Sequence, residues 1–361
     1  MTQRVSRDAL PLRRLAVVLA VAVLVTTAGC TSFTGGGGAS GSADAQVDSV
    51  PARADTIAFV DAQGMLGDDN LRSIANTYFE QQAELMGDYY SGPKSTEDAL
   101  TQMENESGLS ASDVETMTIF SSAKKQVGGQ QGEFSGAIVT SSFTKDELKS
   151  ALTEESSTSY STETYKETTL WVAPKDSYSN TQDAVAWLGD GRFVIGNLAA
   201  VKSVVDVDSG DADAVSGDLR DTFENTRDGY VQFAVSVPQN QFDAGNYQSG
   251  QFDTSSFNSV QMVSGAFYTS GSDVGMTMNL AANTTADAND IKDVTSGALS
   301  LYKGLVEDDT VKSALDKVEV TKDGNTVTMS YENSAANIQA AIEEIYNTSA
   351  SSSTSYAAPA L

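Results

Sequence analysis

Residues 184–205 read AVAWLGDGRFVIGNLAAVKSVV, and this stretch decides how the rest of the chain is interpreted. Two apolar segments suited to β-strands are separated by Gly-Asp-Gly at 189–191, a sequence that favours a tight hairpin turn. Asn197 follows the second segment, and asparagine is a preferred residue at the start of a helix. Apolar residues then recur at helical spacing. The stretch predicts an antiparallel hairpin followed directly by an amphipathic helix.

The same order of elements recurs near the C-terminal end of the sequence. Residues 318–332 contain two alternating segments joined by Lys-Asp-Gly-Asn, and Asn333 and Ser334 then precede a helical pattern. Alternation within strands is typical of antiparallel sheets with one buried face. We therefore expect an α+β fold of two repeated units, 53–227 and 228–347, each an antiparallel sheet with helices packed on one face. The alternative is coincidence, because hairpins and capped helices occur in many α+β proteins.

Residues 1–29 have the features of a signal peptide. Four arginines precede an apolar run at 15–25 (LAVVLAVAVLV), and small residues then lead to Cys30. This pattern resembles the lipobox of exported lipoproteins, which implies cleavage between Gly29 and Cys30 and a lipid on the Cys30 thiol. The alternative is an uncleaved N-terminal anchor, but the apolar stretch is shorter than the ~20 residues that span a bilayer.

The segments around this anchor complete the predicted organisation. Arg13 and Arg14 stand directly before the apolar run and resemble a twin-arginine export signal; general export is the alternative. Residues 30–52 are rich in Gly, Ser, Ala and Asp, so we expect a flexible lipoprotein tether. Residues 348–361 are expected to be a disordered tail rich in Ser and Thr. The protein is therefore predicted to be exported and anchored to the outer face of the cell membrane.

The charge balance points to a salty solvent. The chain has 49 acidic and 22 basic residues, giving a net charge of −27, while 40% of its residues are hydrophobic. Such a protein repels itself in dilute buffer, whereas molar salt shortens the Debye length to about 3 Å and screens the repulsion. We predict a haloarchaeal-type adaptation to high salt; the alternative is that the charge recruits a cationic partner. The absence of a basic stripe argues against binding to nucleic acid.

The residue types exclude several chemistries. The chain has no histidine, and its single cysteine is Cys30, so histidine bases, thiol nucleophiles and zinc–thiolate sites are removed. Carboxylates remain, and they are densest at Asp206, Asp208, Asp211 and Asp213. Calcium binds such oxygen ligands. However, the glycine in this segment is misplaced for a calcium loop and no glutamate closes it, so we favour a solvated acidic loop without a metal. No cofactor is expected.

Three sites fit the N-glycosylation pattern. Asn105, Asn283 and Asn347 each begin an Asn-X-Ser/Thr triplet. Their use is plausible in an exported protein, although the triplet also arises by chance.

Residues 134–237 resemble an uncharacterised family of exported bacterial and archaeal proteins that is known as a domain of unknown function. The matching segments are SGAIVTSSFTKDELKSAL, AVAWLGDGRFVIGNLAAVKSVVDV and DLRDTFENTRDGYVQFAV. The proline-containing segment at 50–56 is also similar to the start of that family. The matched residues belong to strands, turns and helix caps. The resemblance therefore implies the architecture and assigns no activity.

The most favoured function is a lipid-anchored protein of the cell envelope that acts as a non-enzymatic binding or scaffold module. Its partners would be the membrane, through the lipid, and an unidentified envelope protein or ligand. One alternative is the solute-binding lipoprotein of a transporter, but the hairpins here do not match the parallel sheets of those proteins. A hydrolase that uses carboxylates alone is a further alternative.

Overall fold

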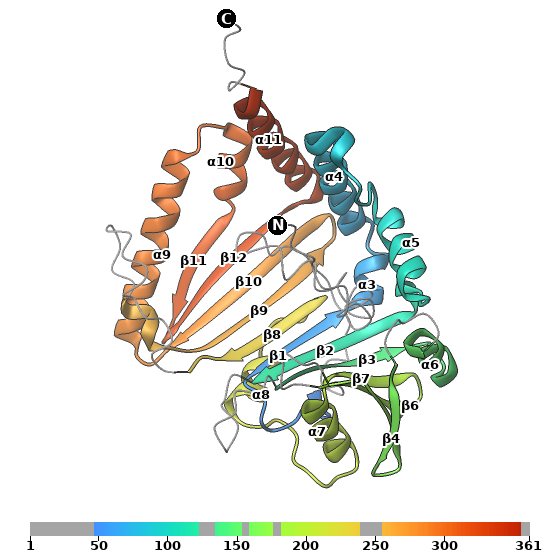
Figure 1. The fold of residues 1–361 in the computed structure, drawn as a ribbon. Helices are drawn as coiled ribbons and strands as arrows, with labels where there is room; N and C mark the ends of the chain where they lie inside the picture. The colour runs from blue at the N-terminus through green and yellow to red at the C-terminus, as the bar shows by residue number, and fades with distance from the viewer. Residues whose placement is uncertain (1–46, 123–133, 154–158, 176–181, 239–254, 355–361) are drawn as a thin grey trace, which may run out of the picture.

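The computed structural model describes residues 47–122, 134–153, 159–175, 182–238 and 255–354 (Figure 1). The described strands form one twelve-stranded sheet in the order β11-β12-β10-β9-β8-β1-β2-β3-β7-β6-β5-β4, and neighbouring strands are antiparallel throughout. The strands are β1 (Thr56–Asp61), β2 (Val114–Ser122), β3 (Phe134–Ser141), β4 (Ser161–Tyr165), β5 (Thr168–Val172), β6 (Asp183–Gly189), β7 (Arg192–Asn197), β8 (Val231–Ser236), β9 (Val260–Ser270), β10 (Asp273–Ala282), β11 (Val318–Asp323) and β12 (Thr326–Ser334). The helices are α3 (Ala62–Gly67), α4 (Asp69–Met86), α5 (Thr96–Ser107), α6 (Lys145–Thr153), α7 (Leu198–Asp208), α8 (Asp218–Glu224), α9 (Thr285–Leu305), α10 (Asp309–Leu315) and α11 (Ala335–Thr354).

The predicted α+β class with antiparallel strands is confirmed. Both hairpins form where the sequence places them, as β6–β7 and β11–β12. The Asn197 side chain accepts a hydrogen bond at 2.9 Å from the Ala200 backbone N–H, and α7 begins directly after it. The turn residues and the helix cap therefore determine this part of the fold locally, as the quoted stretch indicates.

The expected separation into two sheets is wrong, because β1 joins both halves into one sheet. β1 pairs with β2 on one side and with β8 on the other, from Thr56 opposite Val235 to Val60 opposite Val231. Ile57 and Phe59 are buried on one face of β1, and Val60 is buried on the other. A strand with apolar side chains on both faces suits the middle of a sheet, and its sequence does not reveal which strands flank it.

Helices cover both faces of the first half of the sheet, whereas one covered face was expected. On one face, α7 and α8 bury Val201, Val204 and Phe223 against a core that includes Phe59 and Ile138. On the opposite face, α5 and α6 pack on a second core, which includes Met117, Val139 and Trp171. The strands of this half carry apolar residues at consecutive positions, so that each face needs its own covering layer.

Strands β10–β12, at the outer end of the second half, have one helix-covered face, whereas α8 also covers β8 and β9 from the opposite face. Ala288 and Ile291 of α9 are buried against Leu280 and Val327, and α11 packs on the same side of the strands. On the other face, polar side chains follow the strands: the Asn279 amide contacts Ser264 and Thr328 through hydrogen bonds of 3.3 and 2.9 Å. The one-sided arrangement predicted for each unit thus describes β10–β12.

Two predicted boundaries also need correction. Residues 47–52, which were assigned to the flexible tether, are packed into the fold, and the side chains of Val47 and Val50 are 0% exposed. These two valines lie among small and acidic residues, so composition alone hides their role. At the other end, α11 extends through Thr354 and includes the first residues of the predicted disordered tail. Alanine is the best helix former, and serine costs only a few tenths of a kcal/mol more, so a helix that has already been nucleated can continue through them. Residues 355–361 lie outside the described part of the chain.

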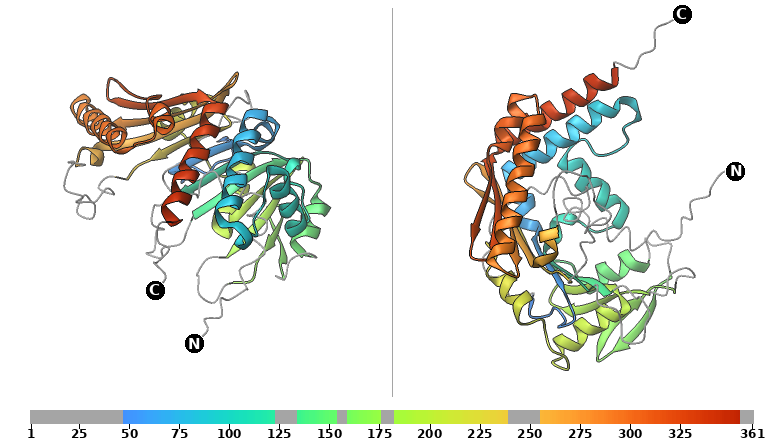
Figure 2. Two further views of the ribbon diagram at one scale, coloured as in Figure 1. Left: turned by 90° about the horizontal axis from the view of Figure 1, so that it is seen from above. Right: turned by 90° about the vertical axis from the view of Figure 1, so that its left-hand side faces the viewer.

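Figure 2 shows how the helices stand on the sheet. α4 and α11 pack side by side and extend away from the strands, and α10 packs next to α11. Among the described residues, none of the helices combines the length and the apolar character needed to cross a bilayer.

Candidate binding surface

Helix α4 reaches the core with its first turns only. Asp68 caps the helix by accepting hydrogen bonds from the N–H groups of Asn70 and Leu71 at 2.8 and 3.1 Å. Leu71 and Ile74 then pack against the core. Farther along the same apolar stripe, Leu85 is 45% exposed. The helix therefore continues beyond the sheet that its first turns cover.

Helix α11 pairs with this free part of α4 mainly through polar groups. The Gln82 side-chain amide donates hydrogen bonds to the hydroxyls of Tyr346 and Tyr78, at 2.9 and 3.0 Å. The Tyr78 and Tyr346 rings meet edge to face with centroids 6.2 Å apart. Ile345 of α11 is 51% exposed. Contacts between the two helices fix their positions and leave apolar side chains uncovered.

Helix α9 shows the same change from buried to exposed along its length. Thr284 caps it by accepting a hydrogen bond from the Asp287 N–H at 3.2 Å. Ile291 is fully buried, but Leu301 and Leu305 of the same apolar stripe are 44% and 70% exposed. Their helical spacing with Ile291 favours burial in the sequence. In the structure, Leu301 and Leu305 belong to none of the core clusters of the described residues.

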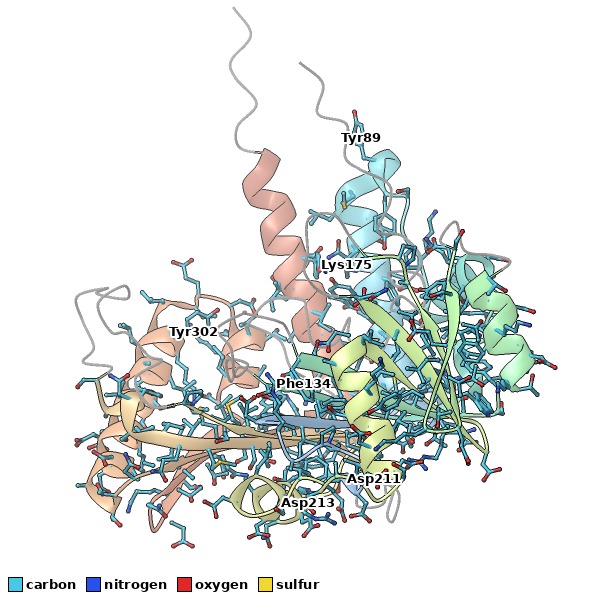
Figure 3. All side chains as sticks on the ribbon, turned by 60° about the horizontal axis from the view of Figure 1, so that its bottom comes forward. Tyr89, Phe134, Lys175, Asp211, Asp213 and Tyr302 are labelled. Atoms are coloured by element: carbon cyan, nitrogen blue, oxygen red, sulfur yellow. The ribbon has the colours of Figure 1, made fainter. Side chains whose placement is uncertain are left out.

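These exposed side chains define the distal apolar surface. Within the described residues, all large hydrophobic side chains that are exposed lie on α4, α9, α11 or the short turn after α4. They are Tyr78, Leu85, Met86, Tyr89, Leu301, Tyr302, Leu305 and Ile345. Figure 3 shows Tyr89 pointing outward at the end of α4 and Tyr302 on α9. Single exposed apolar residues are common on proteins, but their restriction to three helices and one turn favours an interaction site.

The acidic loop has a different organisation. The Lys166 ammonium lies 2.6 Å from an Asp206 carboxylate oxygen and 2.8 Å from one of Asp211. The Arg192 guanidinium lies 3.3 Å from Asp208. Hydrogen bonding to Asp206 and Asp211 raises the pKa of Lys166. Protein cations therefore occupy the places where a metal ion would be needed to neutralise these carboxylates.

The four carboxylates of the calcium candidate do not converge on one point in the structure. Within the described residues, no group of three or more acidic side chains is arranged to hold a metal ion. Asp213, the fourth member of the candidate, is exposed and contributes its backbone carbonyl to a hydrogen bond with the Ala52 N–H at 3.1 Å. Figure 3 shows Asp211 and Asp213 far from Tyr89 and Tyr302. The loop and the distal apolar surface are thus separate features.

Two buried or half-buried carboxylates were not singled out by the sequence. Asp68 accepts hydrogen bonds from the hydroxyls of Tyr230 and Thr269, both at 2.9 Å. Burial raises the pKa of Asp68, but its hydrogen bonds from Leu71, Tyr230, Thr269 and Asn70 together hold that pKa below 3.8. In the sequence, Asp68 stands just before an apolar helical pattern, and an aspartate at that position is typical of a helix cap. That signal could have identified Asp68.

The second of these carboxylates is Asp61, which is 7% exposed. It accepts a hydrogen bond from the Gly64 N–H at 2.8 Å and caps α3. Burial raises the pKa of Asp61, and the bond from Gly64 opposes that effect only in part. Asp61 and Asp68 are thus two helix caps with opposite pKa shifts.

The remaining predicted site residues fall into two groups. Arg13, Arg14, Gly29 and Cys30 lie outside the described residues. The three asparagines of the glycosylation triplets, Asn105, Asn283 and Asn347, are exposed. Asn283 lies in the short connection between β10 and α9, and the other two lie within α5 and α11.

Comparison with known proteins gives no family assignment. No protein-family model matches the sequence, and no curated protein matches it. Crystal form III of TP0453 is similar over 82% of this chain and 97% of that one, with 10% identity and a TM-score of 0.44. Crystal form I of TP0453 is similar over 83% of this chain and 97% of that one, with 9% identity and a TM-score of 0.42. The resemblance to the uncharacterised exported family stays a prediction.

Proposed function

We propose that the protein is an exported, non-enzymatic binding module of the cell envelope, held to the membrane by a lipid on Cys30. Its binding site is the distal apolar surface, and its occupant is a partner protein. One observation carries this proposal: in the described part of a strongly acidic chain, the exposed large hydrophobic side chains are confined to α4, α9, α11 and the turn after α4.

The composition of this surface favours a protein partner. Three of its residues are tyrosines, and Tyr89 is 91% exposed. Tyrosine and methionine are enriched at protein interfaces, where a large side chain buries much area and the tyrosine hydroxyl keeps a hydrogen bond. Exposure of such side chains costs solubility unless a partner covers them. The surrounding acidic surface would limit nonspecific association through like-charge repulsion.

The position of the chain's entry into the fold supports the same occupant. Residues 47–52 enter beside residues 213–215, between α7 and α8. In Figure 1, α7 and α8 lie at the bottom, whereas the ends of α4, α9 and α11 that carry the distal apolar surface lie at the top. A lipid anchor preceding residue 47 would direct this surface away from the membrane. It would then meet another protein of the envelope.

The proposal is tested by replacing Leu85 and Leu305 together with glutamine, with Thr321→Gln on the exposed edge strand β11 as the matched control. The wild type, the double variant and the control are each cross-linked in native membranes at high salt and then purified. We expect one defined partner with the wild type and the control, and its loss with the double variant. An identical set of cross-linked proteins in all three samples would refute the site.

The anchor has its own test, namely the intact mass of the protein extracted from membranes. We expect a chain that begins at Cys30 and carries lipid. A mass that retains residues 1–29 would overturn the proposed anchor while leaving the binding surface to be judged by the cross-linking result.

A further inference from the structure

We propose that residues 47–54, here called the strap, are a releasable segment that sets the length of chain between the fold and its N-terminal attachment. The acidic loop at 206–215, together with Lys166, Arg192 and Arg220, forms the latch that holds the strap. This inference concerns a conformational device and does not depend on which partner the distal apolar surface binds.

Ion pairs and hydrogen bonds hold the first residues of the strap. The Arg220 guanidinium lies 2.7 Å from an Asp48 carboxylate oxygen. Arg192 donates a hydrogen bond of 2.8 Å to the Ser49 hydroxyl and lies 3.3 Å from Asp208. The Ser49 hydroxyl also lies 3.3 Å from the same Asp208 oxygen. Side chains from β7, α7 and α8 thus converge on two strap residues.

The backbone of the strap makes a short connection to the latch. The Val215 N–H donates to the Val50 carbonyl at 2.8 Å, and the Ala52 N–H donates to the Asp213 carbonyl at 3.1 Å. These two bonds flank an isolated antiparallel bridge between Pro51 and Ala214. The backbone of the strap is therefore attached to the latch through one bridge and does not form a strand of the main sheet.

The attachment becomes much stronger at Asp55, the first residue after the strap. The Asp55 N–H donates to the Ser121 carbonyl at 3.0 Å, and the Ser236 N–H donates to the Asp55 carbonyl at 2.7 Å. From Thr56 onward, β1 is paired on both sides. Segments with few backbone bonds open at lower free energy than central strands. Asp55 is thus the hinge at which a withdrawn strap would stop.

Charge makes the latch dependent on its three cations. Lys166 pairs with Asp206 and Asp211, Arg192 with Asp208, and Arg220 with Asp48, so loss of these cations would leave four carboxylates at this end without those ion pairs. The chain has 22 basic residues against 49 acidic ones, and the other cation beside the latch, Lys202, lies over the Tyr165 ring at 5.1 Å. Like-charge repulsion would then favour release of the strap.

Release would extend the chain outside the fold by a defined amount. The strap has eight residues, and an extended chain spans about 3.3–3.6 Å per residue, so the added reach is about 26–29 Å. Val47 and Val50, which are 0% exposed, and the buried Ala54 would leave the core that contains Phe59 and Val215. Arg53 would also leave the Phe134 ring, over which its guanidinium lies at 4.5 Å. The larger aromatic side chains of that core belong to other segments and would stay in place.

The test is hydrogen exchange measured by mass spectrometry on the full chain in molar salt. In the wild type, we expect the amides of the strap to exchange faster than those of β1. In the double variant Arg192→Gln/Arg220→Gln, strap protection should fall by roughly tenfold or more while β1 and β2 keep theirs. Arg72→Gln, which removes an exposed pair with Asp69 on α4, is the control and should leave the strap unchanged.

Two results would overturn the inference. One is equal exchange of the strap and β1 in the wild type, which would make the strap an inseparable part of the core. The other is unchanged strap exchange in a folded double variant. Neither result bears on the distal apolar surface, so failure of the strap and failure of the proposed function can be told apart.

Discussion

The Gln82 side-chain amide donates a hydrogen bond of 2.9 Å to the Tyr346 hydroxyl, joining α4 to α11 across 264 positions of the chain. Gln339 makes a second such contact by donating to the Thr77 hydroxyl at 3.1 Å. These bonds hold the two helices together at positions beyond the sheet. The part of the distal apolar surface that lies on α4 and α11 is therefore presented on a fixed helix pair, and a partner would not need to order that part on binding.

The cap of α4 is expected to be a major contributor to stability. Asp68→Ala removes two helix-cap bonds and the bonds from Tyr230 and Thr269, so we predict a loss of about 2–4 kcal/mol in the free energy of unfolding. Asp69→Ala is the control, since Asp69 pairs only with Arg72 at the surface, and should change it by less than about 0.5 kcal/mol. Urea denaturation in molar salt measures both. Equal losses in the two variants would contradict the role assigned to Asp68.

Asp61 should respond to pH in the opposite sense from Asp68. Burial raises its pKa in the folded protein above the ordinary 3.8, so its charged form opposes folding at neutral pH. Asp61→Asn should therefore be at least as stable as the wild type at pH 7. As pH falls through the folded pKa, the wild type becomes protonated and gains stability relative to the variant.

The measurement is the difference in unfolding free energy between wild type and Asp61→Asn, followed by urea denaturation from pH 7 downward. The stability that the wild type gains relative to the variant should be complete below pH 3.8, the ordinary pKa of Asp61 in the unfolded chain. A difference that does not vary with pH would show that Asp61 has an ordinary pKa in the folded protein.

The turn between β6 and β7 offers a test of backbone geometry. Gly191 and Gly210 have similar positive φ angles of 74° and 76°, but only at Gly191 would an added methyl group overlap the Ser141 carbonyl. Replacement of either glycine by alanine should lower the free energy of unfolding by about 1–2 kcal/mol, because alanine is strained in the left-handed backbone conformation. Gly191→Ala should lower it further, by about 2–5 kcal/mol in total, because the overlap with Ser141 adds to that strain.

Thermal or urea unfolding of Gly191→Ala and Gly210→Ala measures this contrast, and the matched φ angles make Gly210 the control. Similar losses would mean that β3 can move away from the turn. Such movement would be hard to reconcile with the bonds from the Ser141 N–H and hydroxyl to the Gly191 carbonyl, at 3.1 and 2.9 Å.

Salt dependence tests the interpretation of the charge. Only two carboxylate residues, Asp55 and Asp61, are buried among the described residues, so most of the acidity faces solvent. With a net charge of −27, self-repulsion should destabilise the folded state as salt falls below about 1 M, so that the cooperative unfolding transition is lost. Circular dichroism melts across a salt series measure this. A melting temperature that is indifferent to salt would contradict high-salt adaptation.

Local features of the fold could be predicted from the sequence because nearby residues determine them. The Gly-Asp-Gly turn and Asn197 place β6, β7 and α7 correctly. The joining of both halves through β1 and β8 could not be predicted, because strand partners far apart in sequence leave no local signal. The second helix layer on the first half was missed for a related reason: a strand with apolar residues on both faces does not say what covers each face.

The candidate site shows the same limit. The apolar stripes of α4, α9 and α11 predict burial, and Leu71, Ile291 and Ile338 do pack in the core. Leu85, Leu305 and Ile345 continue those stripes into solvent, where the described sheet and helices do not reach. The spacing of apolar residues indicates that a helix has an apolar face, but it does not indicate how far along the helix a neighbouring sheet or helix covers that face. The exposed surface therefore emerged from the structure alone.

The most direct test of the central claim is photo-cross-linking from single positions in native membranes at high salt. A photoreactive amino acid replaces Tyr89 or Leu305 on the distal apolar surface, or Glu319 or Thr321 on the exposed strand β11 as controls. We predict that the same partner protein is captured from both distal positions and from neither control. Capture of lipid alone from the distal positions, or the same products from all four, would contradict a protein-binding role for this surface.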